Sequence, residues 1–323
     1  MTTGILAVEP SRTRVVICAA DASDLDGAEV RFPAVRFALC DNSTPGLLSE
    51  ADILFVRRWM SDHELQLLPR TLRWLHIEGV GVDHVVPRLP DHIHPIITNG
   101  RGLSSDLIAE YALCVLMMLR WQMPRAVLQQ QQHRWERWTT SSVVGTTLAL
   151  IGLGEVGRAI AKRAVAIGMK VIGARRQPGP VRYVEEVYAA SQLHRVLSLA
   201  DSTIVAVPLT AATEGMVDSA AIESMRRGSY LVNIGRGRVV SETALLSALA
   251  SGHLAGAALD VFAQEPLSSD SPLWDAPNLI ITPHIAGAMS GLRVRAVEFF
   301  FENLQRFLQG EPLRSVVNRE TGY

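Results

Sequence analysis

The sequence predicts an α/β protein built on parallel sheets, and three observations support this class. Short apolar runs alternate with segments of helical character along most of the 323 residues. One of these runs ends in a glycine-rich segment, Gly152–Gly157, which is the expected junction between a strand and a helix. The composition, 48% hydrophobic and 20% charged, is that of a globular chain long enough for two domains with sizeable cores.

Taken in order, the first part of the chain predicts a small parallel sheet. Polar segments separate its apolar runs, as the crossover segments of an α/β unit would. The candidate strands are Arg14–Cys18, Arg36–Cys40, Ala51–Val56 and Trp74–Ile77, and Ile96–Asn99 leads onward through a glycine turn.

A long helix is predicted to follow. Ser104, Ser105 and Asp106 are helix-capping residue types, and they precede an apolar segment that extends to Arg120. Because apolar residues occupy much of its circumference, we expect this helix to be buried between two bodies of protein. Pro124 is expected to bend or interrupt it.

The rest of the chain predicts a larger, doubly wound parallel sheet and a final helix, Arg293–Leu308, that returns to the first domain. We therefore expect one domain formed by residues 1–104 with 291–323, and a second formed by residues 105–290. The candidate strands of the second domain are Thr147–Ile151, Met169–Ala174, Ser202–Val207, Tyr230–Ile234, Ala255–Leu259 and Leu279–Thr282.

The glycine segment predicts a dinucleotide site of the Rossmann type, because it follows a strand and opens a helix. Gly152 permits the tight turn, Gly154 lets the backbone approach a pyrophosphate, and Gly157 lets the helix lie close to the strand. The backbone N–H groups at the start of the helix, which include those of Glu155 and Val156, would then face the anion.

The choice between NAD and NADP depends on the end of the next strand. Sites for NAD place a carboxylate about twenty residues beyond the glycines, where it binds the ribose hydroxyls. No Asp or Glu lies between Glu155 and Glu185, and Arg175 and Arg176 occupy the expected place. An arginine pair can bind the 2′-phosphate of NADP, so we predict NADP(H) as the preferred cofactor, with NAD(H) as the alternative. Ordinary solvated loop charges are the other interpretation of these two arginines.

Several further residues lie where parallel strands are expected to end. Gly79, Val80 and Gly81 leave backbone N–H groups approachable for an anion, although glycine turns without ligands are common. Three polar residues also stand near predicted strand ends, and each alone has a plain structural interpretation as a loop cation, a helix-start carboxylate or a turn histidine. They are Arg236, Glu265 and His284.

Together these segments resemble the D-2-hydroxyacid dehydrogenase family along nearly the whole chain. The resemblance includes Gly79–Asp83, the segment Asn99–Glu110, the segment Val207–Thr210 with Thr213, and Gly310–Leu313. It implies two Rossmann-like or flavodoxin-like domains, with the cofactor domain inserted into a smaller substrate domain that also contributes to catalysis.

The resemblance also implies roles for individual residues. Arg236, Glu265 and His284 fall on the family's catalytic arginine, glutamate and histidine. Reduction of a 2-keto acid needs a proton donor beside the carbonyl oxygen, which suits His284; Glu265 would orient it, and Arg236 would bind the carboxylate. The substrate-binding set is Val80, Gly81 and Arg57, and the cofactor-binding set is Gly152, Gly154, Glu155, Val156, Gly157, Arg175, Arg176, Pro208, Thr213 and Asp260.

The substrate remains open among related possibilities. The arginine pair resembles that of NADPH-dependent glyoxylate and hydroxypyruvate reductases, which is the leading prediction. Arg57 and Arg58 resemble a position near the substrate in phosphoglycerate dehydrogenases, which would imply a second anionic group on the substrate; a surface arginine is the alternative. A dinucleotide-sensing corepressor without turnover is the candidate from another class of protein.

Bulk properties exclude several kinds of partner. The formal net charge of −1 offers no general attraction for nucleic acid or an anionic membrane, so a small molecule is the expected partner. We also expect no signal peptide, no membrane span and no metal site. Cys18, Cys40 and Cys114 show no pairing pattern, which predicts buried thiols in the cytoplasm. By resemblance to the family, a homodimer is expected.

Overall fold

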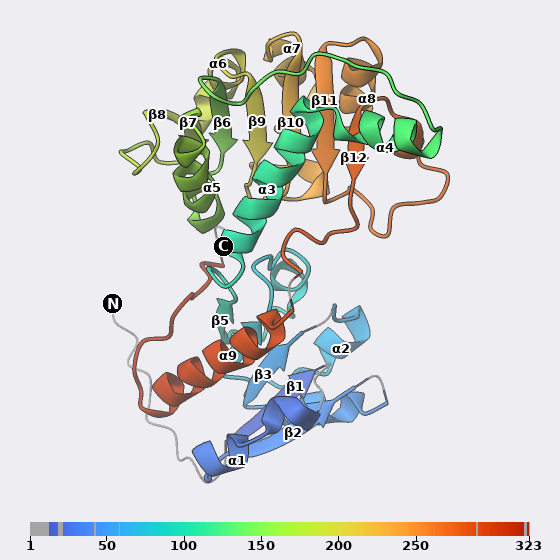
Figure 1. Ribbon diagram of the computed structural model, residues 1–323. Helices are drawn as coiled ribbons and strands as arrows, with labels where there is room; N and C mark the ends of the chain where they lie inside the picture. Colours follow the sequence, from blue (N-terminus) through green and yellow to red (C-terminus); the bar gives the residue numbers. More distant parts are fainter. Residues whose placement is uncertain are drawn as a thin grey trace. The chain divides into compact units, whose positions relative to one another are not determined.

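The computed structural model describes residues 13–18, 22–41, 43–57, 59–288, 290–319 and 322. The chain forms two compact units, one of Met1–Leu103 with Ser290–Tyr323 and one of Ser104–Met289 (Figure 1). Each unit contains a sheet whose strands are all parallel. The predicted fold class, two α/β units with one inserted into the other along the chain, is therefore confirmed.

The first unit has a five-stranded sheet in the order β2-β1-β3-β4-β5. The order reverses between β1 and β3, and ligands bind at the carboxyl ends of strands beside such a switch point. The strands are β1 (Arg14–Cys18), β2 (Arg36–Cys40), β3 (Ile53–Val56), β4 (Trp74–Ile77) and β5 (Ile96–Asn99), and the helices are α1 (Ala28–Arg31), α2 (Asp62–Gln66) and α9 (Leu292–Leu308), with 3₁₀ turns at Ala22–Leu25, Pro45–Glu50 and Val86–Arg88.

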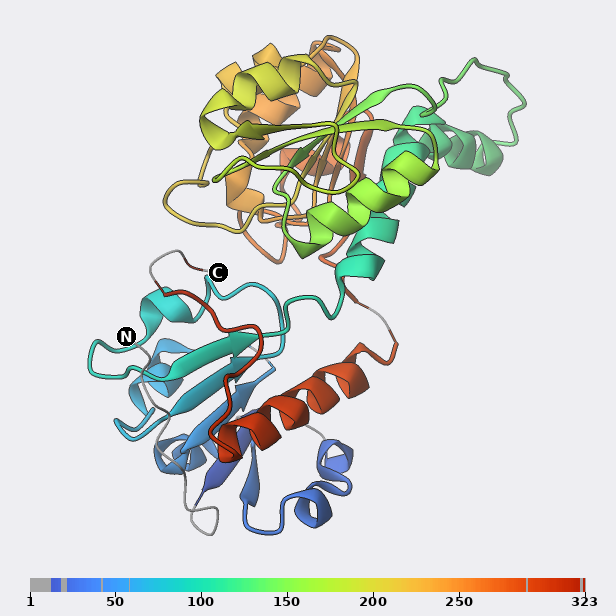
Figure 2. The ribbon, with the colours of Figure 1, turned by 90° about the vertical axis from the view of Figure 1, so that its left-hand side faces the viewer.

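Helix α9 supplies much of the apolar cover on one face of this sheet, and Figure 2 shows it running alongside the sheet. The ring of Phe300 stacks on Trp74 and on Phe55, with centroids 5.0 Å and 4.7 Å apart. The buried residues of α9, which include Phe300 and Leu304, recur at the three- and four-residue spacing of one helix face. The last helix of the chain thus completes the core of the first unit.

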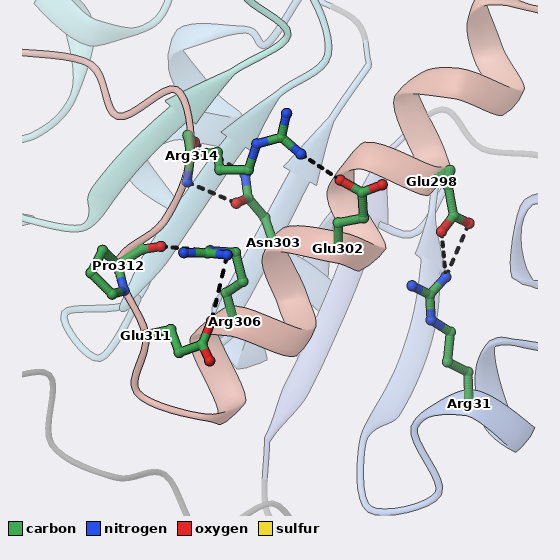
Figure 3. Close-up of polar contacts among 8 residues, drawn as sticks. All are labelled: Arg31, Glu298, Glu302, Asn303, Arg306, Glu311, Pro312 and Arg314. Carbon is green, nitrogen blue, oxygen red and sulfur yellow. Dashed lines mark hydrogen bonds and ion pairs between the residues drawn. The ribbon is translucent and has the colours of Figure 1, made fainter.

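Polar contacts hold both sides of α9 in place (Figure 3). Buried Asn303 accepts a hydrogen bond from the N–H of Arg314 at 2.9 Å and donates to its carbonyl oxygen at 3.1 Å. Arg314 also pairs with Glu302 at 2.6 Å, and Arg31 pairs with Glu298 at 2.8 Å. These contacts fasten the returning chain to the helix and the helix to α1.

The second unit has a seven-stranded sheet in the order β12-β11-β10-β9-β6-β7-β8. The order reverses at β6 and β9, the switch point of a doubly wound sheet. The strands are β6 (Thr147–Ile151), β7 (Lys170–Arg175), β8 (Glu186–Ala189), β9 (Ser202–Val205), β10 (Ser229–Asn233), β11 (Leu254–Leu259) and β12 (Leu279–Ile281), and the helices are α3 (Ser105–Arg120), α4 (Met123–Gln131), α5 (Glu155–Ala166), α6 (Leu193–Ser198), α7 (Ser219–Ser224) and α8 (Glu242–Ala250), with 3₁₀ turns at Ala190–Gln192, Gly237–Val239 and Pro272–Asp275.

Helices cover both faces of this sheet. Apolar residues of α3 and α5 pack on one face, and those of α6, α7 and α8 pack on the other. The interior strand β6 is almost fully buried, which explains its unbroken apolar sequence from Leu148 to Ile151. The loops at the carboxyl ends of the strands are therefore anchored to a rigid layer.

Several sequence predictions need correction. Strand β8 was not expected, because Glu186–Ala189 is a short edge strand without a continuous apolar run. Helix α3 packs within the second unit and exposes a stripe of Asp106, Glu110 and Cys114, spaced four residues apart. The prediction that all three cysteines are buried was therefore wrong for Cys114, whereas Cys18 and Cys40 are buried.

Candidate active site

The predicted cofactor and catalytic residues of the second unit gather at the carboxyl ends of its parallel strands. The glycine turn follows β6, and Arg175 ends β7. Pro208 lies beyond β9, Arg236 beyond β10, and Asp260 directly after β11. Glu265 follows in the same loop as Asp260, and His284 lies beyond β12. This is the edge where parallel sheets bind their ligands.

The glycine turn fits a dinucleotide. Gly152 has a φ of +105°, and a Cβ there would lie 2.7 Å from the carbonyl oxygen of Ala206. A Cβ on Gly157 would lie 2.1 Å from the carbonyl oxygen of Gly152, so both positions need glycine for the fold. A Cβ on Gly154 would meet nothing within 4 Å. The space beside Gly154 is therefore open for a ligand to approach the backbone.

Helix α5 begins at this turn, with Gly154 as its N-cap. The N–H groups of Glu155, Val156 and Gly157 belong to the first turn, where a helix offers no internal acceptor. The carboxylate of Glu155 is exposed and pairs with Arg158 at 2.9 Å. The amides and the positive end of the helix dipole suit the diphosphate of a nucleotide.

Arg175 and Arg176 lie beside the glycine turn. The N–H of Gly152 donates to the carbonyl oxygen of Ala174 at 3.0 Å, so the end of β7 is tied to the turn. Arg175 is half-buried and Arg176 is exposed. Two guanidinium groups thus stand where an NAD site would place a carboxylate.

A short loop follows β9 on the other side of the glycine turn. The hydroxyl of Thr213 donates to the carbonyl oxygen of Pro208 at 2.6 Å and accepts from the N–H of Thr210 at 2.8 Å. Pro208 is exposed. The side chain of Thr213 therefore closes this loop, which explains why a threonine stands at that position.

His284 and Glu265 are in direct contact. Nδ1 of His284 lies 2.7 Å from Oε2 of Glu265, and both side chains remain partly exposed, at 47% and 33%. The other carboxylate oxygen of Glu265 accepts from the N–H of Phe262 at 2.9 Å. Because Glu265 uses Nδ1, the ring nitrogen Nε2 is the atom of His284 that can serve a ligand.

Asp260 holds the backbone around His284. Its buried carboxylate accepts hydrogen bonds from the N–H groups of Ile285 and Ala286, both at 2.9 Å, and from the hydroxyl of Thr282 at 2.6 Å. The N–H of His284 donates to the carbonyl oxygen of Asp260 at 2.9 Å. His284 itself has a φ of +54°, a left-handed conformation that this network stabilises.

Sequence reasoning missed the other members of this network. Thr282 donates its hydroxyl proton to Asp260, so Tyr111 must be the donor in the contact between the hydroxyl groups of Tyr111 and Thr282. Burial raises the pKa of Tyr111 to about 12, which keeps it protonated. Tyr111 comes from α3, and nothing in the local sequence relates it to the loop at Thr282.

Asn233, at the end of β10, was also missed. Its buried side chain accepts from the N–H of Gly235 at 3.1 Å and donates to the carbonyl oxygen of Arg236 at 3.0 Å. A Cβ on Gly237 would lie 1.8 Å from the carbonyl carbon of Phe262, so the turn carrying Arg236 rests directly on the loop that leads to Glu265. The signal in the sequence was the asparagine itself, a polar residue at the end of a buried apolar strand.

In the first unit, the predicted substrate-binding residues lie at the carboxyl ends of β3 and β4. Arg57 pairs with Glu78, its Nε lying 3.0 Å from Oε1 of that carboxylate. The amide of Asn99 donates to the carbonyl oxygen of Val80 at 2.6 Å, which fixes the loop that contains Val80 and Gly81. Arg58 lies outside the described residues.

These features define the class of the protein as a nicotinamide-dependent dehydrogenase, with a glycine turn at a helix start and an oriented histidine on parallel α/β units. Comparison with known proteins identifies the family. Residues 113–286 match the model of the NAD binding domain of D-isomer specific 2-hydroxyacid dehydrogenases. The chain belongs to this family and is an NAD(P)-dependent D-2-hydroxyacid dehydrogenase, as the sequence resemblance predicted.

Three relatives illustrate the range of the family. A glyoxylate reductase of Korarchaeum cryptofilum is 33% identical over 255 residues, which cover 75% of each chain. A D-3-phosphoglycerate dehydrogenase of Mycobacterium bovis is 31% identical over 272 residues, covering 83% of this chain but 51% of that enzyme. The solved structure of an NADPH-dependent glyoxylate/hydroxypyruvate reductase of Sinorhizobium meliloti, in complex with NADP and sulfate, superposes with a TM-score of 0.82 at 29% identity, covering 96% of this chain and 100% of the other.

Two other properties bear on the kind of ligand. Across the described ranges, no helix combines the length and apolar character needed to cross a lipid bilayer. In the same part of the chain, no group of three or more His, Cys, Asp or Glu side chains is arranged to hold a metal ion.

Proposed function

We propose that this protein is an NADP(H)-dependent reductase that converts glyoxylate, hydroxypyruvate or a related small 2-keto acid to the D-2-hydroxy acid. The observation that carries the proposal is the 2.7 Å contact between His284 and Glu265 at the carboxyl edge of the larger sheet. This contact presents an oriented imidazole where a cofactor-dependent reaction would take place.

The proposed chemistry assigns the proton to His284. When bound, the reduced cofactor supplies the hydride that reaches the carbonyl carbon. Nε2–H of His284 donates the proton to the carbonyl oxygen during reduction, and Nε2 takes the proton back during oxidation. Glu265 accepts from Nδ1–H, which sets the ring orientation and stabilises the charged imidazolium.

Other residues bind the substrate and orient the cofactor. Arg236 binds the substrate carboxylate through its planar guanidinium and polarises the carbonyl. In the first unit, the N–H groups of Val80 and Gly81 suit an anionic group of the substrate, and Arg57 is the candidate for recognising its side chain. Asp260 would lie near the nicotinamide carboxamide of the bound cofactor and would set which face is presented. We therefore assign a substrate-binding role to the first unit and a cofactor-binding role to the second.

The cofactor preference rests on the end of β7. Gly152, Gly154 and the first amides of α5 bind the diphosphate, and Pro208 and Thr213 contact the nicotinamide half. Arg175 and Arg176 bind the 2′-phosphate by charge-assisted hydrogen bonds. The NADP held by the Sinorhizobium meliloti relative supports this choice, and NAD(H) is the alternative.

A phosphoglycerate-dehydrogenase-like activity is the second candidate. The Mycobacterium bovis relative and the arginine at position 57 favour it. This chain spans about half of that relative's length. A substrate with a second anionic group would then replace glyoxylate or hydroxypyruvate. A corepressor-like sensor would bind the dinucleotide without turnover, and no observation favours it over an enzyme.

A cytoplasmic homodimer completes the proposal. The segment from Trp121 to Val144 exposes apolar side chains, including Leu128 at 56% and Trp135 at 94%. Exposed apolar residues gathered on one segment are typical of an interaction surface. Sedimentation of the purified protein should give twice the mass of the 35.3 kDa chain, and a Trp135→Ser variant should weaken this association.

A substrate panel tests the proposed activity. Oxidation of NADPH is followed with glyoxylate, hydroxypyruvate, phenylpyruvate and 3-phosphohydroxypyruvate, and again with NADH. Saturable turnover of glyoxylate or hydroxypyruvate with NADPH is the expected result. Equal KM values for NADPH and NADH would contradict the cofactor assignment, and tight binding without turnover would favour the sensor.

A further inference from the structure

A partly buried ion pair stands at the carboxyl edge of the first unit's sheet. Strands β3 and β4 are neighbours in register, with Val56 opposite Ile77, so Arg57 and Glu78 follow them side by side. Nε and Nη2 of Arg57 each lie 3.0 Å from Oε1 of Glu78. The side chains are 9% and 23% exposed, respectively, so the pair is largely shielded from water.

The pair is rigidly connected to the proposed substrate loop. Glu78 immediately precedes Gly79, whose carbonyl oxygen accepts from the N–H of Gly100 at 3.0 Å. A Cβ on Gly100 would lie 2.0 Å from the carbonyl oxygen of Glu78, so the two backbones touch. The side-chain amide of Asn99 donates a hydrogen bond to the carbonyl oxygen of Val80. Glu78 is therefore fixed relative to the backbone N–H groups of Val80 and Gly81.

The charges of this pair determine what kind of substrate group can lie beside it. A shielded guanidinium with no carboxylate beside it would attract a second anionic group strongly. Here Glu78 satisfies two of the guanidinium nitrogens and adds a negative charge at the same place. A phosphate or a second carboxylate arriving at this edge would meet a neutral pair and would have to displace Glu78.

We propose that Glu78 is a specificity-determining residue that masks Arg57, so that the enzyme takes 2-keto acids with an uncharged side chain and discriminates against those with a second anionic group. This inference rests on the proposed function, and it selects the reductase over the phosphoglycerate-dehydrogenase-like alternative.

The test compares hydroxypyruvate with 3-phosphohydroxypyruvate, which differ only in the phosphate group. The wild-type enzyme should have the higher kcat/KM with hydroxypyruvate. Glu78→Gln keeps the shape of the side chain but removes its charge, so the ratio of kcat/KM for the phosphorylated substrate to that for hydroxypyruvate should rise about tenfold to hundredfold, the worth of a hydrogen bond to a charged group.

Three further variants make the result specific. Arg57→Gln/Glu78→Gln removes both charges, so the ratio should return towards the wild-type value. Arg57→Gln alone should cause no selective loss with the phosphorylated substrate, because Arg57 does not bind it in the wild type. Glu302→Gln removes the carboxylate of another ion pair of the first unit, that with Arg314 (Figure 3), and should leave the ratio unchanged.

The outcomes separate this inference from the proposed function. Absence of turnover with every keto acid would contradict the proposed function. The inference is then tested by titrating glycolate and tartronate, which carries a second carboxylate, into wild type and Glu78→Gln in the presence of NADP⁺. An unchanged ratio in Glu78→Gln, a wild-type preference for the phosphorylated substrate, or its selective loss in Arg57→Gln would each overturn the inference. The last two outcomes need no substitution of Glu78, so they hold even if Glu78→Gln does not fold.

Discussion

Nδ1 of His284 lies 2.7 Å from Oε2 of Glu265, while the second oxygen of the same carboxylate is held by the N–H of Phe262. Glu265 is thus fixed at both oxygens and presents the imidazole in one orientation. If His284 moves the proton, His284→Ala should lower kcat by about 10²–10⁴-fold, the usual contribution of a general acid or base. Glu265→Gln should lower it less, and both variants should retain NADPH binding in a fluorescence titration.

Glu223→Gln is the control for these two variants, since Glu223 is exposed and bonds only to Ser219 among the contacts described for it. Its kcat should match the wild type. Wild-type kcat/KM in His284→Ala with the best substrate of the panel would show that another group transfers the proton.

Gly154→Ala and Gly157→Ala should fail in different ways. The added methyl group at Gly154 meets no protein atom within 4 Å apart from its chain neighbours, so the variant should fold with only the small loss of Tm of an N-cap change, yet bind NADPH more weakly. The methyl group at Gly157 would collide with the carbonyl oxygen of Gly152, so that variant should lose stability as well. Thermal unfolding without cofactor, compared with the NADPH dissociation constant, separates the two effects. Unchanged NADPH affinity in Gly154→Ala would place the diphosphate elsewhere.

Arg175→Ser/Arg176→Ser should shift the cofactor preference. Loss of charge-assisted hydrogen bonds to the 2′-phosphate should raise KM for NADPH by about tenfold to hundredfold and leave KM for NADH nearly unchanged. Arg195→Ser, at an exposed arginine of α6, is the matched control. A parallel rise in both KM values would mean that the arginines support the fold and not the phosphate.

Acid should destabilise the first unit through His76. Burial lowers the pKa of His76 to about 3, whereas the unfolded chain has the ordinary value of 6.5. Because the unfolded state binds the proton first, the stabilisation is complete above pH 6.5 and is lost as the pH falls towards 3, with an upper limit of about 5 kcal/mol. The ring lies among Phe55, Trp74 and Phe300, and these neighbours supply no counter-ion for a charged imidazolium.

Denaturant unfolding at pH 7, 6, 5 and 4 measures this effect. His76→Phe preserves an aromatic ring, and Thr98 keeps its hydrogen bond from Trp74 at 2.8 Å. The free energy of unfolding of the variant should depend less steeply on pH than that of the wild type. Equal slopes would assign the acid sensitivity to other groups.

The sequence predicted the sheets well because most strands are buried on both faces. Runs such as Leu148–Ile151 are apolar without interruption, and turn residues mark where they end. The edge strand Glu186–Ala189 was not predicted. It pairs with a single neighbouring strand and is partly exposed, so its sequence does not need a continuous apolar run. Cys114 is exposed because it lies on the outward face of α3. The composition of the sequence does not show which face of a helix points outward.

Candidate site residues could be named from the sequence where the chemistry requires a particular residue type, as at Gly152 or His284. Its supporting residues were not. Tyr111 and Thr282 are 171 positions apart in the chain, so their contact depends on how α3 crosses the sheet. Likewise, Arg57 pairs with Glu78 because β3 and β4 are neighbours in the sheet, and no local sequence pattern indicates this pairing.

Helix α9 has a consequence for how the protein is made. The ribosome releases the strands that carry Val15, Phe55 and Trp74 long before it releases Phe300 and Phe307, which cover them. The inserted unit, Ser104–Met289, is by then fully synthesised and can fold as a unit. The outer unit, although it begins first, waits for the last helix with one sheet face uncovered. Nascent chains stalled before residue 292 should therefore engage chaperones through that face.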